Sequence, residues 1–178
     1  IPKLYMTVHP ILVAPDKRLK LRSNHVESVD DEIRALLSDM LETMYAGDGL
    51  GLAAIQIGVP KRVMVLDVHG PNEQPTPMKL INPEITWFSP EYIVYQEGCL
   101  SFPEYFADVK RSAEVRVSYL DENGEAHEVE ASETLAVCIQ HEVDHLDGKL
   151  FVDHLSLVKR NIILRKMAKA QRAKAQEV

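Results

Sequence analysis

The stretch Gln140-His141-Glu142-Val143-Asp144-His145 contains the pattern H-E-x-x-H, with two histidines four residues apart. On an α-helix, positions i and i+4 project from one face, so His141 and His145 can both reach one cation. Glu142 would lie beside that cation, where a carboxylate can take a proton from a bound water. A mononuclear catalytic site needs a third protein ligand and an open position. The stretch therefore predicts a metal-binding helix whose third ligand lies elsewhere.

Apolar residues cover much of the circumference of this helix, which predicts that it is buried with strands packed around it. These residues are Leu135, Val137, Cys138, Ile139 and Leu146. Ser132 is expected to cap the start of the helix, and Gly148 is expected to end it.

The rest of the chain predicts an α+β fold, with antiparallel β-sheets packed around the H-E-x-x-H helix, an N-terminal helix and a C-terminal helix. The N-terminal helix should begin within Ser28 to Asp31 and end near Gly47, because apolar residues recur there at helical spacing. The C-terminal helix should begin near Ser156. No internal repeat and no second domain boundary is visible, so residues 1–178 are expected to form a single domain.

Strands are expected where β-favouring residues run between turn signals. They are residues 62–68, 79–87, 114–120 and 126–130. Asn123-Gly124 predicts the turn of a hairpin. Residues 10–24 are expected to be an irregular arm with a turn at Pro15-Asp16. Taken alone, Gly49 to Gln56 is expected to be a glycine-containing turn.

Composition favours a protein of the reducing cytoplasm that does not enter a membrane. No apolar run approaches a membrane span, and no signal peptide is visible. The two cysteines do not make a disulfide framework. The chain starts at Ile1, so Met6 is one candidate for the natural start, with residues 1–5 a cloning remnant. A trimmed targeting segment, and with it an organellar origin, is the alternative.

The net charge of −7 is unevenly distributed. Residues 156–178 hold seven Lys/Arg and one acidic residue, a charge of +6, whereas the preceding residues hold 13 basic and 26 acidic side chains, a charge of −13. A solvated helix face is the usual explanation of such a run. One-sided charge against an acidic body favours a polyanionic partner for the tail.

Several residues are candidates for the third metal ligand. They are Cys99, Cys138, Asp144, Asp147, His154 and the remaining histidines. Cys138 lies in an apolar run and is read as a buried structural cysteine. Cys99 lies between Gly98 and Leu100 in a segment that would leave a thiolate accessible. The residues alone do not decide between Cys99 and the other candidates.

Three blocks together resemble peptide deformylase. They are G-x-G-L-A-A-x-Q (Gly49 to Gln56), E-G-C-L-S-x-P (Glu97 to Pro103) and Q-H-E-x-D-H-L-x-G (Gln140 to Gly148). H-E-x-x-H alone occurs in many metalloproteases, whereas the three blocks in this order are specific. The resemblance extends from the Pro15-Asp16 turn to the last helix.

The resemblance implies a site and a reaction. Cys99, His141 and His145 would bind one metal, with Glu142 as general base and then proton donor. The side-chain amide of Gln56 and the backbone N–H of Leu100 would hold the developing oxyanion. The reaction implied is removal of the N-formyl group from the first methionine of nascent polypeptides, which releases formate.

The chemistry of the ligands and the resemblance to the family predict different metals. One thiolate and two imidazoles suit zinc. The resemblance implies Fe(II), with zinc, nickel or cobalt present after purification. It also implies a monomer whose basic C-terminal helix docks on the ribosome.

The resemblance is weakest at the pocket for the methionine side chain. The resemblance places Leu50, Tyr95, Phe102 and Val137 around it, with Gly51 positioned to hydrogen-bond the peptide backbone. Leu50, Tyr95 and Phe102 stand where many relatives have isoleucine, and Phe106 stands where some have arginine. Each of these residues is equally typical of an ordinary hydrophobic core. A pair between Glu97 and Arg111 is expected to brace the Cys99 loop.

Two other functions compete with a deformylase. A small zinc endopeptidase would take its third ligand from a residue after His145. A non-catalytic module would keep the fold for a ribosomal role, but it has no physical need for Glu142, Gln56 and Cys99 together.

Overall fold

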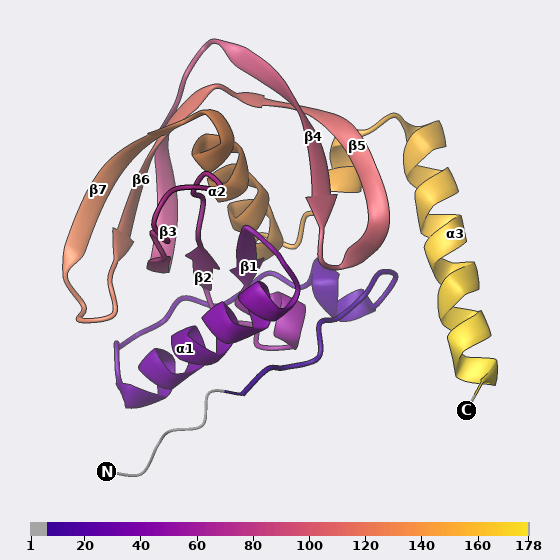
Figure 1. Ribbon diagram of the computed structural model, residues 1–178, viewed down its shortest axis with the longest axis horizontal. Coiled ribbons are helices and arrows are strands. Elements are labelled where there is room, and N and C mark those ends of the chain that lie inside the picture. The colour runs from indigo at the N-terminus through magenta and orange to yellow at the C-terminus, as the bar shows by residue number, and fades with distance from the viewer. Residues whose placement is uncertain (1–6, 178) are drawn as a thin grey trace.

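The computed structural model describes residues 7–177. It has three α-helices and seven strands (Figure 1). The helices are α1 (Asp31–Ala46), α2 (Glu133–Leu146) and α3 (Leu157–Gln176). The strands are β1 (Gly51–Ala53), β2 (Val63–Leu66), β3 (Met78–Phe88), β4 (Tyr92–Cys99), β5 (Phe102–Ser112), β6 (Glu114–Leu120) and β7 (Ala126–Ser132). Short 3-10 helices occupy Lys17–Lys20, Ala54–Ile57 and Phe151–His154. Residues 1–5, for which a cloning origin was considered, lie outside the described part.

The strands form two antiparallel sheets, as predicted. The larger has the order β1-β2-β3-β6-β7, and the smaller is the hairpin β4-β5. In Figure 1 this hairpin arches over α2 and comes down beside α3. The metal-motif helix α2 therefore contacts strands of both sheets. The predicted α+β class, with sheets around a central H-E-x-x-H helix, is confirmed.

Strand β2 shows why this arrangement is stable. All four of its residues are buried, because helices cover both faces of the sheet there. Val63 and Val65 pack with α1 in one apolar cluster, whereas Met64 and Leu66 pack with α2 in another. Successive side chains of a strand point to opposite faces. A continuous apolar run therefore serves two cores at once.

The boundaries of the helices follow local signals, with one correction. Asp30 caps α1 by accepting a hydrogen bond from the Ile33 N–H, and Ser156 caps α3 in the same way. Ser132 occupies the position before α2, but its side chain makes no capping hydrogen bond, so that prediction was wrong. Gly148 follows α2 with φ of +75°. A Cβ there would lie 2.4 Å from the carbonyl oxygen of Lys20, so only glycine fits.

Three segments differ from the sequence-based expectations. Gly51–Ala53 is a strand, not a turn, because it pairs with β2. Residues 102–112 form the long strand β5, which was not predicted. The irregular arm contains the 3-10 helix Lys17–Lys20, whose buried Leu19 joins an apolar cluster with β5 and α3.

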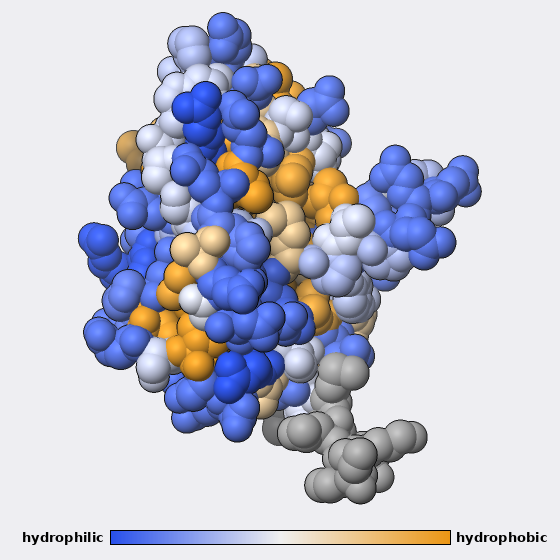
Figure 2. Space-filling model, turned by 90° about the vertical axis from the view of Figure 1, so that its left-hand side faces the viewer, coloured by the Kyte–Doolittle hydropathy of each residue, from blue (hydrophilic) through white to orange (hydrophobic). Residues whose placement is uncertain are grey.

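The surface is predominantly polar. On the face shown in Figure 2, hydrophobic side chains form small patches separated by hydrophilic ones. Within residues 7–177, no helix combines the length and the apolar character needed to cross a bilayer.

Candidate metal centre and active-site cavity

Cys99 and the two histidines of α2 converge on one point. The Cys99 Sγ lies 3.3 Å from the His145 Nε2. The ligand atoms of Cys99, His141 and His145 all lie within 4.8 Å of one another. Cys99 is the last residue of β4, so the smaller sheet supplies one donor and α2 supplies two. A thiolate with two imidazoles at this spacing fits a divalent transition metal such as zinc or iron.

The remaining nitrogen of His141 is held by a buried ion-pair network. The His141 Nδ1 lies 2.8 Å from Oε1 of Glu97, which leaves Nε2 for the metal. Arg111 donates two hydrogen bonds to Glu97, of 2.7 and 2.9 Å, and a third to Asp144 at 2.7 Å. His154 lies 2.8 Å from the same Asp144 oxygen. The expected Glu97–Arg111 pair is therefore present and positions a ligand as well as the Cys99 loop.

This network also shows what two of the candidate ligands do. Asp144 is a partner of Arg111 and does not belong to the group of converging donors. His154, the histidine downstream of the motif, pairs with Asp144 instead of reaching the centre.

Burial and charge set the protonation of the acidic and thiol groups here. Burial raises the pKa of Glu142 to about 7. Burial also acts to raise the pKa of Glu97, but the hydrogen bonds from Arg111 and His141 outweigh it and hold that pKa below its usual value. At Cys138 burial raises the pKa to about 12, so its thiol stays protonated. That supports a structural role for Cys138.

Two buried atoms at the centre have no hydrogen-bond partner among the described residues. They are Oε2 of Glu142 and Nδ1 of His145. Glu142 is only 4% exposed, and a buried carboxylate without a partner is costly. The orphaned oxygen therefore suits a group that enters with the metal, its water or the substrate.

The side-chain amide nitrogen of Gln56 points towards Cys99, one of the three metal donors. Its Oε1 accepts a hydrogen bond of 2.9 Å from the Ala53 N–H, which fixes the orientation of the amide. Its Nε2 donates to Oγ of Ser101 at 3.1 Å and lies 3.6 Å from Sγ of Cys99. Ser101 is a site residue that the sequence reasoning missed. Its only signal was its place in the E-G-C-L-S-x-P block.

Gly51 brings β1 against the acid on α2. A Cβ at this position would lie 2.8 Å from Oε1 of Glu142 and 2.9 Å from Cδ2 of Leu66. Any side chain here would displace Glu142, so glycine allows the β1 backbone to run beside it.

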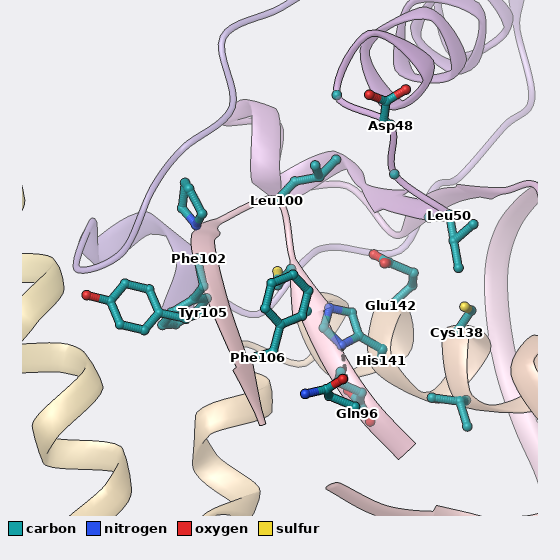
Figure 3. Close-up of a pocket in the computed structure, with 18 of the residues that line it drawn as sticks. Asp48, Leu50, Gln96, Leu100, Phe102, Tyr105, Phe106, Cys138, His141 and Glu142 are labelled. Atoms are coloured by element: carbon teal, nitrogen blue, oxygen red, sulfur yellow. Dashed lines mark hydrogen bonds and ion pairs between the residues drawn. The ribbon is translucent and has the colours of Figure 1, made fainter. Parts of the chain in front are cut away.

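A cavity of about 560 Å³ opens over this centre (Figure 3). It is lined by all the predicted pocket residues, namely Leu50, Gly51, Tyr95, Phe102 and Val137. It is also lined by Gln56, Cys99, Leu100, His141 and Glu142. His145 is 1% exposed and does not line the cavity. The structure therefore brings together every site residue expected from the sequence.

The pattern of residues also matches a known family. A family model described as polypeptide deformylase matches residues 8–161. The chain belongs to the polypeptide deformylase family. Deformylases are metal-dependent hydrolases that remove the N-formyl group from nascent peptides.

Individual deformylases are similar along nearly the whole chain. A peptide deformylase of Phenylobacterium zucineum is 54% identical over 168 residues, which cover 94% of this chain and 99% of that protein. The crystal structure of peptide deformylase from Ehrlichia chaffeensis has a TM-score of 0.90 and 43% identity, and covers 95% of this chain and 99% of that one. A second structure of that enzyme, in complex with actinonin, also has a TM-score of 0.90, at 46% identity and coverage of 94% and 99%.

Proposed function

We propose that residues 1–178 form one deformylase domain, in which Cys99, His141 and His145 hold one metal and Glu142 performs the proton transfers. The substrate is the N-formyl group of formyl-methionyl nascent peptides, and the products are formate and a free amine. The observation that carries this assignment is the unpartnered, buried carboxylate of Glu142 beside three converging metal donors. A structural metal site would have no use for such a carboxylate.

A metal held by Cys99, His141 and His145 would activate a water and supply positive charge to the site. Glu142 would accept the proton of the attacking water and would then return a proton to the leaving nitrogen. Burial favours this exchange because it makes the carboxylate a stronger base than it is in water. The Gln56 amide and the Leu100 N–H stabilise the negative charge that develops on the formyl oxygen.

The substrate backbone is proposed to enter as an additional strand. Within residues 7–177, β1 is an edge strand of the larger sheet and β4 pairs only with β5, so each offers an open edge. Residues of both strands, including Gly51 and Tyr95, line the cavity. An extended peptide can pair with such edges through its main chain. The methionine side chain then enters the apolar end of the cavity near Phe102 and Val137.

Fe(II) is proposed as the resident metal in the cell, with zinc, nickel or cobalt taking its place during purification. The donor set accepts all four ions, and the resemblance to bacterial deformylases favours iron. Elemental analysis of anaerobically prepared protein tests this. Iron should be the main metal, and air should lower activity unless nickel or cobalt has replaced it. Stoichiometric zinc in the anaerobic protein would contradict the assignment.

The decisive assay is release of formate from formyl-Met-Ala-Ser. A deformylase releases formate and leaves the peptide bonds intact, whereas a zinc endopeptidase would cleave an internal bond. A non-catalytic module would do neither. No formate with any divalent metal would defeat the proposed function.

The basic helix α3 is proposed to dock a monomeric, cytoplasmic enzyme on the ribosome. Its Lys and Arg side chains are almost all exposed, and only Met167 of the helix is buried. Deleting the residues after Leu157 should preserve formate release from a short peptide and weaken salt-sensitive ribosome binding. Unchanged ribosome affinity would contradict the docking role. Sedimentation of the free protein tests the monomer.

A further inference from the structure

A second cavity lies against a different face of α2 from the one that carries the metal ligands. Its volume is about 680 Å³, which is within the range of small-molecule sites. The helix contributes four lining residues at helical spacing, namely Gln140, Val143, Asp144 and Asp147. No residue lines both this cavity and the one over the metal centre. The second cavity is therefore separate from the candidate active site.

The second cavity is positively charged although the body of the protein is acidic. Five Lys and Arg side chains line it, against three acidic ones, a balance of +2 with histidines neutral. Residues 1–155 as a whole carry −13. The basic residues are Arg22, Arg62, Lys110, Arg111 and Lys149, and the acidic ones are Glu84, Asp144 and Asp147. A local excess of one sign inside a cavity attracts ligands of the other sign.

The ion pairs in the second cavity leave two of its cations available. Arg62 pairs with Asp147 at 3.0 Å, and Arg111 pairs with Asp144 at 2.7 Å, so both aspartates are neutralised. Arg22 and Lys149 are exposed and form no ion pair with any residue between 7 and 177. They are free to bind an anion.

Two exposed aromatic side chains also line the second cavity. Phe88 ends β3 and is 53% exposed, and Tyr92 begins β4 and is 60% exposed. The Nζ of Lys110 lies 4.3 Å from the centroid of the Tyr92 ring, which places a further cation beside an aromatic ring. Exposed aromatic rings next to basic side chains form a platform on which a flat, anionic ligand can stack.

We propose that the second cavity binds a small aromatic anion of the nucleoside monophosphate class. Arg22 and Lys149 hold the phosphate, and the base stacks on Phe88 or Tyr92. An inorganic phosphate would leave the aromatic rings without a partner, and an uncharged ring would leave the two cations without one. A ligand that combines both groups uses the whole cavity. The inference concerns a site apart from the metal centre and does not depend on the deformylase reaction.

The test is titration calorimetry of the metal-loaded protein with AMP, adenosine and inorganic phosphate. AMP should bind about tenfold more tightly than adenosine or phosphate, because stacking and charge each contribute to its binding. Added salt should weaken AMP binding, because the phosphate contacts are electrostatic. Single-stranded oligo(A) should bind no more tightly than AMP.

Variants separate the two parts of the second cavity. The double variant Arg22→Ser, Lys149→Ser should weaken AMP binding by about tenfold and remove most of its salt dependence. Phe88→Ala combined with Tyr92→Ala should weaken AMP binding by about tenfold and leave phosphate binding unchanged. Thermal unfolding without ligand shows whether each variant is folded.

Two matched controls lie outside the second cavity. Arg165→Ser, Lys169→Ser removes two exposed cations from α3, and Val94→Ala truncates an exposed apolar side chain of β4. None of these three residues lines the cavity, so both control proteins should bind AMP as the wild type does.

Three results would overturn the proposal. They are AMP binding no tighter than phosphate, AMP binding of wild-type strength in folded Arg22→Ser, Lys149→Ser, and oligo(A) binding more than about tenfold tighter than AMP. The first excludes the aromatic part, the second excludes this cavity, and the third identifies a nucleic-acid surface in place of a small-molecule site. Each result leaves the proposed deformylase function unaffected, because the titration does not measure formate.

Discussion

The helices α2 and α3 differ in how much of their surface the fold covers. Eight of the 14 residues of α2 are buried, whereas Met167 is the one buried residue among the 20 of α3. Strands of both sheets surround α2, and α3 stands at one side of the molecule (Figure 1).

The difference shows how burial fixes the orientation of the side chains that form the site. On α2, every buried polar side chain must find a partner or be reserved for one, because an unpaired buried group is costly. The orientation of His141 is therefore fixed by Glu97 and Arg111. On α3 most of the charged side chains remain in water and can be replaced singly at little cost.

The largest effect is expected for Glu142→Gln on α2. The amide cannot take a proton from water, so formate release should fall by about 10²–10⁴-fold, while metal content and circular dichroism stay unchanged. Glu177→Gln, just after α3, is the matched control and should keep full activity. An active Glu142→Gln protein would remove the proton-transfer role from α2.

Arg111→Met tests the network that supports α2. Arg111 is 5% exposed, and its loss leaves the buried Glu97 and the partly buried Asp144 without their cation. The free energy of unfolding should fall by about 3–5 kcal/mol, measured by urea denaturation. Arg165→Met on α3 removes an exposed charge and should change it by less than about 0.5 kcal/mol. Equal effects would mean that the two helices do not differ as described.

Within α3, Met167 and Ile162 allow a buried side chain to be compared with an exposed one. Met167 is 3% exposed and Ile162 is 46% exposed. Met167→Ala should cost about 2 kcal/mol or more by loss of buried surface, and Ile162→Ala should cost clearly less. Thermal unfolding of the two variants measures the difference. Similar costs would show that α3 does not pack through Met167.

The smallest effect concerns a buried acid away from both helices. Asp67 is the partner of the Tyr45 hydroxyl and lies 2.7 Å from Nδ1 of His69. Burial acts to raise its pKa, but these hydrogen bonds and one from the Thr76 N–H outweigh it, so the pKa lies below its usual value. A lowered pKa in the folded state gives stability that is present above the unfolded pKa of about 3.9. This stability is lost as pH falls through the folded pKa.

Unfolding free energy should therefore decrease more steeply below about pH 4 in the wild type than in Asp67→Asn. Asp31→Asn is the control, because Asp31 is exposed and should leave the acid dependence unchanged. Parallel curves for wild type and Asp67→Asn would exclude this contribution.

Local patterns in the sequence predicted α1, α2, most strands of the larger sheet and the antiparallel class. They were effective because apolar periodicity reports which face of an element is buried. The strand β5 was missed because its residues 102–112 mix charged and aromatic side chains without a clean alternation. Its pairing with β4 is a tertiary interaction. β1 was missed because glycine and alanine have little strand preference, and pairing with β2 overrides it.

The site was predictable to the extent that its residues stand in recognisable blocks. The helical spacing of His141 and His145 identified two donors from physics alone. The residues left Cys99 undecided, because nothing local says that the end of β4 folds back over α2. Ser101, which holds Gln56, and the link from Asp144 to His154 were visible only once the chain was folded.

The shortness of β1 has a consequence for how the protein behaves in a crowded solution. An open sheet edge invites pairing with any extended chain, and long exposed edges promote aggregation. β1 is three residues long, so it offers pairing over little more than the first residues of a peptide. If the substrate pairs with β1 as proposed, this edge recognises the start of a chain by its backbone, whatever protein follows, and an edge this short gives little template for association between two folded copies.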